Sequence, residues 1–383
     1  RYAVTQDVRL VGTYEIAEGE TLKARQLRGG IEVSPWQGGQ VVTTLGEETI
    51  GENGNRTFAA FGLSQTLALS PALTIDATID GNRTLGGNPG TGSVINPAQP
   101  TASGGQITGG LLFEDFTAVT FGAAWRKDRW SVVARGELRD GETVDRKGFT
   151  FGAIRQLGEG SLVGSGATWT LSQAAGGARA EIVDASIAFA HRPSASPLAM
   201  LGRLEYRSDQ ITGGVAGEIG VGIGAGAGRT ALVVDGNATS RRLVASLSSN
   251  FSPRGQDNGS EVRRHEVALF LGARHNFDQF EGTEFSGTSV LVGADARIGI
   301  GERFELGGSA TARSNLTDQV TSFAFGPTLG VVPAKGMLVT VGYNVEGFRD
   351  GDFGAARNTS KGAFAAVRMA FDTDSFSFLG LGR

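Results

Sequence analysis

Residues 337–348 read Met-Leu-Val-Thr-Val-Gly-Tyr-Asn-Val-Glu-Gly-Phe, and apolar residues alternate with small or polar ones along much of this stretch. Successive side chains of a β-strand point to opposite faces. One face would therefore carry Met337, Val339, Val341, Tyr343 and Val345. Stretches of about ten residues with the same alternation recur from end to end of the chain, separated by turn residues, as expected for the strands of an outer-membrane barrel.

The alternation predicts about eighteen strands, with no helical period between them. We expect them at residues 8–18, 22–33, 40–48, 56–69, 73–83, 117–126, 130–139, 146–156, 161–173, 181–192, 199–209, 241–251, 261–275, 286–299, 304–313, 320–331, 337–348 and 362–371. The predicted fold class is all-β: an antiparallel transmembrane β-barrel of about 18 or more strands, with short periplasmic turns and longer extracellular loops.

Composition agrees with a barrel and excludes several other classes. The chain has 383 residues, 60 of them glycine, no cysteine and a net charge of −4. Glycine occurs in strands and turns alike, which suits tight curvature rather than a flexible linker. No apolar run approaches the roughly 18 residues of a transmembrane helix, but a barrel carries its apolar residues at every second position. The small net charge indicates no nucleic-acid surface.

The connections between the expected strands alternate in length. Tight ones such as Lys127–Arg129 and Gly158–Gly160 alternate with a set that includes residues 86–116, 210–240 and 350–361. Outer-membrane barrels place short turns in the periplasm and longer loops outside. This predicts the outer membrane of a Gram-negative cell, with the C-terminus in the periplasm.

We expect a single barrel domain. It would span residues 1–371 and be incomplete at its N-terminus, because residues 1–4 read like the end of a strand. Residues 372–383 would form a C-terminal tail. Residues 213–235 are expected to form an extra hairpin, either in the wall, where it would add two strands, or above the rim.

Charged residues are candidates for the lining of the lumen. A charge costs about 2–4 kcal/mol on the lipid face at mid-depth, so charged positions should point inward. The candidates, on strand faces opposite the apolar ones, are Asp76, Asp80, Arg135, Glu137, Arg139, Arg203, Glu205, Arg207, Asp295, Arg297, Glu305, Arg313, Glu346 and Arg368. They would form either charge rings that select solutes or the ion-pair ladders that line any wide barrel.

No motif predicts catalysis, a cofactor or a metal. The glycine run 220–228 fails the spacing of nucleotide-binding loops, and no helix follows it. His191, His265 and His275 have no ligand spacing, and no nucleophile elbow or H-E-x-x-H is present. We therefore expect no catalytic, cofactor-binding or metal residues, and a protein that is not an enzyme.

Aromatic residues lie near the ends of expected strands and predict an interfacial girdle. They are Trp36, Trp125, Trp130, Phe348 and Phe371. Phe371 also ends the last alternating strand, the position at which barrels commonly carry the aromatic that the assembly machinery reads. We expect it to be the assembly signal.

The last hairpin resembles the end of a proteobacterial family. The residues that carry the likeness are Gly342–Asp350, Asp352-Phe353 and 363–372, joined by residues 33–39, 52–56 and 61–66. The family consists of large cell-surface proteins whose C-terminal part is an outer-membrane barrel, often behind extracellular repeat domains. This chain departs from it in running on from Thr373 to Arg383.

The resemblance implies a membrane anchor, and a conduit, for a larger cell-surface protein. It implies as partners the lipid and lipopolysaccharide of the outer membrane, the barrel assembly machinery, and upstream surface domains or other envelope proteins. The alternative is a porin-like channel for passive diffusion of small polar solutes. Repeat domains upstream would favour the anchor, and a signal peptide directly before Arg1 the porin. A third hypothesis, an outer-membrane enzyme, requires catalytic side chains clustered at the rim.

Overall fold

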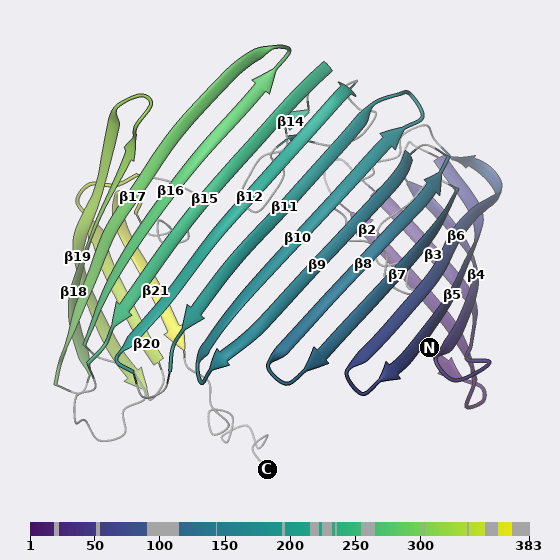
Figure 1. Cartoon of the computed structure of the whole chain (residues 1–383), viewed down its shortest axis with the longest axis horizontal. Coiled ribbons are helices and arrows are strands. Elements are labelled where there is room, and N and C mark those ends of the chain that lie inside the picture. The colour runs from purple at the N-terminus through teal and green to yellow at the C-terminus, as the bar shows by residue number, and fades with distance from the viewer. Residues whose placement is uncertain are drawn as a thin grey trace.

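In the computed structural model, nineteen strands within the part of the chain that the structure describes form one antiparallel sheet (Figure 1). The structure describes residues 1–18, 23–50, 54–89, 115–142, 144–193, 196–214, 222–223, 232–233, 236–253, 265–301, 303–334, 337–348 and 359–369. No helix within these ranges is long and apolar enough to cross a membrane.

The sheet is a simple meander. Each strand pairs antiparallel with its neighbour in sequence, except that β12 pairs with β15. The strands of the sheet are β1 (Tyr2–Ala3), β2 (Val8–Glu18), β3 (Lys23–Val33), β4 (Gly39–Ile50), β5 (Gly54–Ser70), β6 (Leu73–Pro89), β7 (Phe116–Lys127), β8 (Trp130–Gly141), β9 (Val144–Gly158), β10 (Ser161–Ala174), β11 (Arg179–His191), β12 (Leu198–Gly214), β15 (Gly236–Phe251), β16 (Glu266–Phe280), β17 (Thr283–Ile300), β18 (Phe304–Asn315), β19 (Val320–Ala334), β20 (Met337–Asn344) and β21 (Gly362–Met369).

The predicted fold class is confirmed: the wall is all-β and antiparallel, and the strand beyond the expected eighteen or so is the two-residue β1. In the extra segment, β13 (Gly222–Ile223) and β14 (Leu232–Val233) form a separate two-stranded sheet, so they do not join the wall. Closing the barrel requires a pairing between its first and last strands. No such pairing occurs among the described residues, and residues 370–383 lie outside them.

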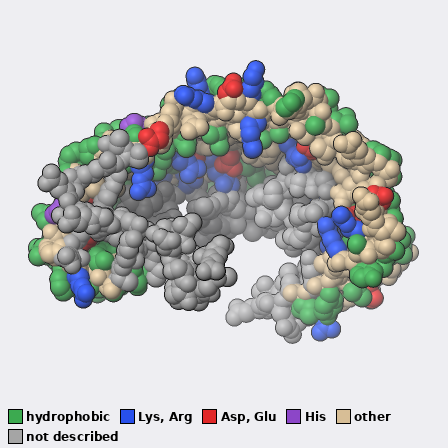
Figure 2. Space-filling view, turned by 90° about the horizontal axis from the view of Figure 1, so that it is seen from below, with side chains coloured by type: hydrophobic (Ala, Val, Ile, Leu, Met, Phe, Trp, Pro, Cys, Tyr) green, Lys and Arg blue, Asp and Glu red, His purple; other side chains and the backbone are tan. Residues whose placement is uncertain are grey.

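The sheet curls into an arch with a convex and a concave face (Figures 1 and 2). Side chains splay apart on the convex face of a curved sheet and crowd together on the concave one. Strand β16 shows the result: convex Val267, Leu269 and Leu271 are 45, 55 and 52% exposed, while the alternate residues are half-buried. The buried residues accordingly line the inside of the arch, in small clusters such as Leu291, Ala324 and Phe348.

The two ends of the sheet differ. The turns at 71–72, 128–129 and 159–160 are all at one end, which we call the turn end. The opposite end, the loop end, carries the connections 90–115, 215–235 and 345–361. The grouping of the expected short turns is therefore confirmed.

Not every connection follows this contrast in length. At the turn end, residues 252–265 separate β15 from β16. At the loop end, β16 and β17 extend past their expected limits and meet in a two-residue turn, Glu281-Gly282, at which both residues have positive φ (45° and 83°). Positive φ at both central residues is the type I′ geometry that matches the twist of a hairpin.

Candidate functional site

The concave face carries the charged residues predicted for the lumen. Residues paired across adjacent strands point to the same face, so faces can be followed from strand to strand. Thr120, fully buried on the concave face, pairs with Thr78 on one side and Glu137 on the other. The same register places on this face Asp76, Asp80, Arg135, Glu137, Arg139, Arg203, Glu205, Arg207, Asp295, Arg297, Glu305 and Arg313.

One ion pair spans three strands, and a glycine makes it possible. Asp76 on β6 and Arg135 on β8 both pair with Gly122 on the strand between them. A Cβ atom at Gly122 would lie 2.5 Å from the Asp76 carboxylate. Because glycine has no Cβ atom, the Asp76 Oδ2 and Arg135 Nη2 atoms approach to 2.5 Å. Nearby, the Arg139 guanidinium lies 4.2 Å from the ring centroid of Phe116.

A second cluster ties β11, β12 and β15 together. Arg207 donates to both carboxylate oxygens of Asp209 at 3.0 Å and lies 3.8 Å from Asp184. In the same cluster, Glu205 accepts from both Arg203, at 2.7 Å, and Arg242, at 3.3 Å. Cations and anions therefore alternate across this part of the wall, and most of them are paired.

The most deeply buried charges were not predicted from the sequence. Arg56 on β5 and Glu48 on β4 are directly paired, and both side chains are 0% exposed. Gln26 donates to the same carboxylate at 2.8 Å. Arg56 also donates to Thr84 at 3.1 Å and lies 3.6 Å from Asp115, the residue just before β7. The alternation of residues 40–48 could have revealed Glu48, because it shares parity with Val42 and Thr44.

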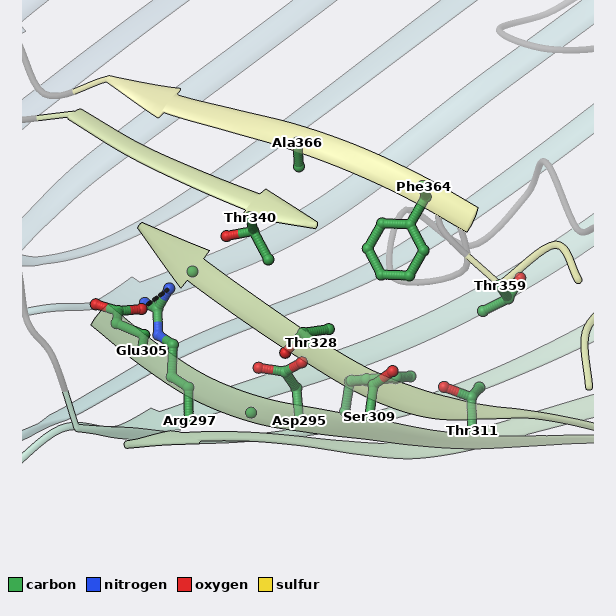
Figure 3. Close-up of a pocket in the computed structure, with 13 residues that line it drawn as sticks. Asp295, Arg297, Glu305, Ser309, Thr311, Thr328, Thr340, Thr359, Phe364 and Ala366 are labelled. Atoms are coloured by element: carbon green, nitrogen blue, oxygen red, sulfur yellow. Dashed lines mark ion pairs between the residues drawn. The ribbon is translucent and has the colours of Figure 1, made fainter. Parts of the chain in front are cut away.

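A cavity of about 230 Å³ lies on the concave face of the C-terminal strands β16–β21 (Figure 3). Its charged end consists of Asp295, Arg297 and Glu305. Hydroxyl groups and two rings complete the lining: Ser309, Thr311, Thr328, Thr340, Thr359, Phe270 and Phe364, with Gly307, Gly330 and Ala366. Arg297 is ion-paired with Glu266, and its Nη1 atom lies 4.0 Å from Glu305. Three of the predicted lumen residues thus meet in one cavity.

Three of the predicted residues, Glu346, Arg368 and Phe371, lie near or beyond the ends of strands β20 and β21. Strand β20 ends at Asn344, short of the expected residue 348, so its register does not extend to Glu346. Glu346 is exposed and bridges to Phe325, a convex-face residue. The backbone of Arg368 pairs with buried Leu338, but its side chain lies outside the described part, as do Phe371 and the tail 372–383.

The convex face is apolar over the middle of the sheet and polar toward its ends. On β18 its residues are Phe304, Leu306, Gly308, Ala310 and Ala312. At about 3.3 Å per residue this row covers about 26 Å of strand, or about 20 Å of membrane depth at a tilt of about 40°, close to the apolar band of about 25 Å in outer-membrane barrels. Lys147 near the loop end and Arg155 near the turn end of β9 lie toward the limits of the band.

Aromatic side chains lie at the turn end of the sheet, near the limit of the apolar band. Arg155 stacks on Trp130 at 5.0 Å from the ring centroid, and Trp36 donates to Gln65 at 2.5 Å. Phe348, expected in the same girdle, is instead buried in the concave cluster, with Arg313 5.1 Å from its ring centroid.

The described residues contain no group of three or more His, Cys, Asp or Glu side chains placed to hold a metal ion. His191 and His275 each contact a hydroxyl, of Ser161 and Thr288 respectively, at 2.9 Å.

Comparison with known proteins gives a faint likeness to two solved structures. No protein-family model matches the chain, and no curated protein matches it. One structure, a bacterial polysaccharide outer membrane secretin, is 9% identical with a TM-score of 0.32, over 84% of this chain and 96% of that one. The other, the copper transporter OprC, is 10% identical with a TM-score of 0.34, over 94% of this chain and 66% of that one. Similarities this low establish neither a family nor a function, and the fold rests on the strand pairing itself.

Proposed function

We propose that the chain is an outer-membrane β-barrel that anchors a larger cell-surface protein and serves as its conduit. The observation that carries the proposal is the division of the two faces. Apolar side chains cover the middle of the convex face, as lipid requires, while ion-paired charges and hydroxyls cover the concave face, as water requires. The likeness of the last hairpin to barrels of large surface proteins supports the anchoring role.

The same division supports the accompanying proposals. The chain would sit in the outer membrane of a Gram-negative cell, in contact with lipid and lipopolysaccharide, after insertion by the barrel assembly machinery. The turn end would face the periplasm, together with the C-terminus. Upstream surface domains or other envelope proteins would be its partners, and the chain would have no enzymatic activity.

A porin-like channel is the second candidate, favoured by the composition of the concave face. This face combines many small residues with charges of both signs, as in Asp76–Arg135 and Glu205–Arg242. Such a lining admits small polar solutes and selects weakly between cations and anions.

Conductance in planar lipid bilayers tests whether the lumen is open, which the porin requires. The purified, refolded chain should first show the heat-dependent gel mobility of a folded barrel and fractionate with outer membranes when expressed behind a cleavable signal peptide. An open barrel would then give a large conductance proportional to salt concentration. A folded barrel without conductance would support a plugged anchor and eliminate the porin. A chain that never folds in lipid would contradict both.

A further inference from the structure

The cavity between β16 and β21 contains a carboxylate oxygen with an unused hydrogen-bonding capacity. The Glu305 side chain is 3% exposed, and its Oε1 atom is buried without a hydrogen-bond partner. Its other oxygen is 4.0 Å from Arg297, which is long for an ion pair. A buried acceptor left unmatched costs about 1–3 kcal/mol, and more for a charged group. A donor brought by a ligand would remove that cost.

The strand register places a glycine beside this carboxylate. Glu305 pairs with Gly330, which pairs in turn with Thr340 and then Ala366. A Cβ atom at Gly330 would lie 3.0 Å from the Cβ atom of Glu305. The missing side chain at Gly330 therefore lets Glu305 and Leu338 pack closely at this edge of the cavity. The terminal torsion of glutamate is soft enough to turn an oxygen toward the cavity.

The opposite side of the cavity is less polar. The ring of Phe364 projects from β21 over the space between Thr340 and Thr359, while Ser309 and Thr328 line the floor (Figure 3). The charge balance is negative, because Arg297 already pairs with Glu266 and the cavity also holds Asp295. The cavity has a volume of about 230 Å³. The cavity is thus small, acidic at one end and aromatic at the other.

We propose that this cavity binds a small organic cation, a primary alkylammonium group, on the wall of the barrel. The ammonium N–H groups would donate to Glu305 and to the hydroxyl oxygen of Thr328, whose strand partner Gly307 lies two residues from Glu305. The alkyl chain would pack against Phe364. The proposal deepens the proposed function, because it presumes a concave face that solutes can reach.

Calorimetric titration of the folded full chain tests it, with n-butylammonium as the probe. Butan-1-ol is the matched uncharged probe, and butyrate is the matched probe of opposite charge. We expect one saturable site per chain for n-butylammonium and none for the other two. Glu305→Gln should weaken binding at least tenfold, and Thr328→Val, which keeps shape and net charge, several-fold. Asp76→Asn removes a concave carboxylate elsewhere in the wall and should leave the affinity unchanged.

If butan-1-ol bound as tightly as n-butylammonium, the cavity would be an apolar pocket only. If Asp76→Asn weakened binding as much as Glu305→Gln, the probe would be attracted unspecifically to the charged wall. Either result overturns the proposal, as does wild-type affinity in Glu305→Gln. Each variant is first checked for heat-dependent gel mobility, so that misfolding is not read as lost binding. A barrel that conducts ions but does not bind the probe keeps the proposed function and loses only this inference.

Discussion

At the scale of single residues, the wall is organised by charges and the glycines beside them. Gly122 lets Asp76 and Arg135 meet across a strand, and Gly330 lets Glu305 pack closely at the edge of the cavity. The presence of inward charges followed from the alternation of the sequence, because a charge facing lipid is costly. Their partners did not follow. Arg56 contacts Glu48, Thr84 and Asp115 through a register that period-two reading cannot supply.

The buried Arg56–Glu48 pair should be costly to break. Arg56→Leu leaves the Glu48 carboxylate buried without its cation, so we expect a loss of about 3–5 kcal/mol in the free energy of unfolding. The double variant Glu48→Leu/Arg56→Leu should recover most of that loss, because no charge remains uncompensated. Urea unfolding in lipid vesicles measures both. Arg155→Leu, which removes an exposed stacking arginine, is the control and should cost less than about 1 kcal/mol. A double variant as unstable as Arg56→Leu would contradict this account.

The Glu281-Gly282 turn provides a purely conformational test. Gly282 has a φ of 83° and no atom within 4 Å of an added Cβ, so Gly282→Ala should cost about 1–2 kcal/mol through backbone strain alone. Gly158 has equally open surroundings and no left-handed backbone, and Gly158→Ala should change stability by less than about 0.5 kcal/mol. The same unfolding assay compares them. Equal effects would mean that the turn does not hold this geometry in the membrane.

At the scale of elements, the sequence predicted the strands well and their ends poorly. Alternation located all the long strands, since each must present one apolar face. It missed the extensions of β16 and β17, because the residues near their shared turn, beyond the apolar band, no longer alternate strictly. It also carried β20 four residues too far. The position at which pairing stops depends on the neighbouring strand, which a single segment does not encode.

The two faces of one strand pair should respond differently to the same charge. Convex Leu271 of β16 and concave Ser246 of β15 lie at nearly the same height, because Leu271 pairs with Leu247 and Ser246 with Gly272. Leu271→Arg should lower the free energy of unfolding in lipid by about 2–4 kcal/mol, and Ser246→Arg by much less. Similar costs for both variants would show that the convex face is not in contact with lipid.

At the scale of the whole molecule, the arch separates an apolar exterior from a polar interior (Figure 2). We base its proposed orientation in the membrane on the contrast between the turn end and the loop end. Alternating loop lengths were readable in the sequence, whereas the long 252–265 connection at the turn end was not. The cavity at Glu305 could not be predicted either, because it depends on the register between the successive strands β16 to β21.

Labelling of intact cells tests that orientation. The chain lacks cysteine, so single substitutions can be labelled without background. Ala175 is exposed in the β10–β11 turn at the loop end, and Arg129 is exposed in the β7–β8 turn at the turn end. A membrane-impermeant maleimide should label Ala175→Cys on intact cells, and Arg129→Cys only after the outer membrane is opened. The reverse pattern would invert the topology.

The central claim is that one face of this sheet contacts lipid and the other contacts water. Spin labels placed one at a time along β16, from Val267 to Arg274, test it most directly in folded, lipid-embedded protein. We predict that labels at 267, 269, 271 and 273 collide with oxygen dissolved in the bilayer, while labels at 268, 270, 272 and 274 collide with a water-soluble nickel chelate. Accessibility without a period of two, or with the opposite phase, would contradict the account.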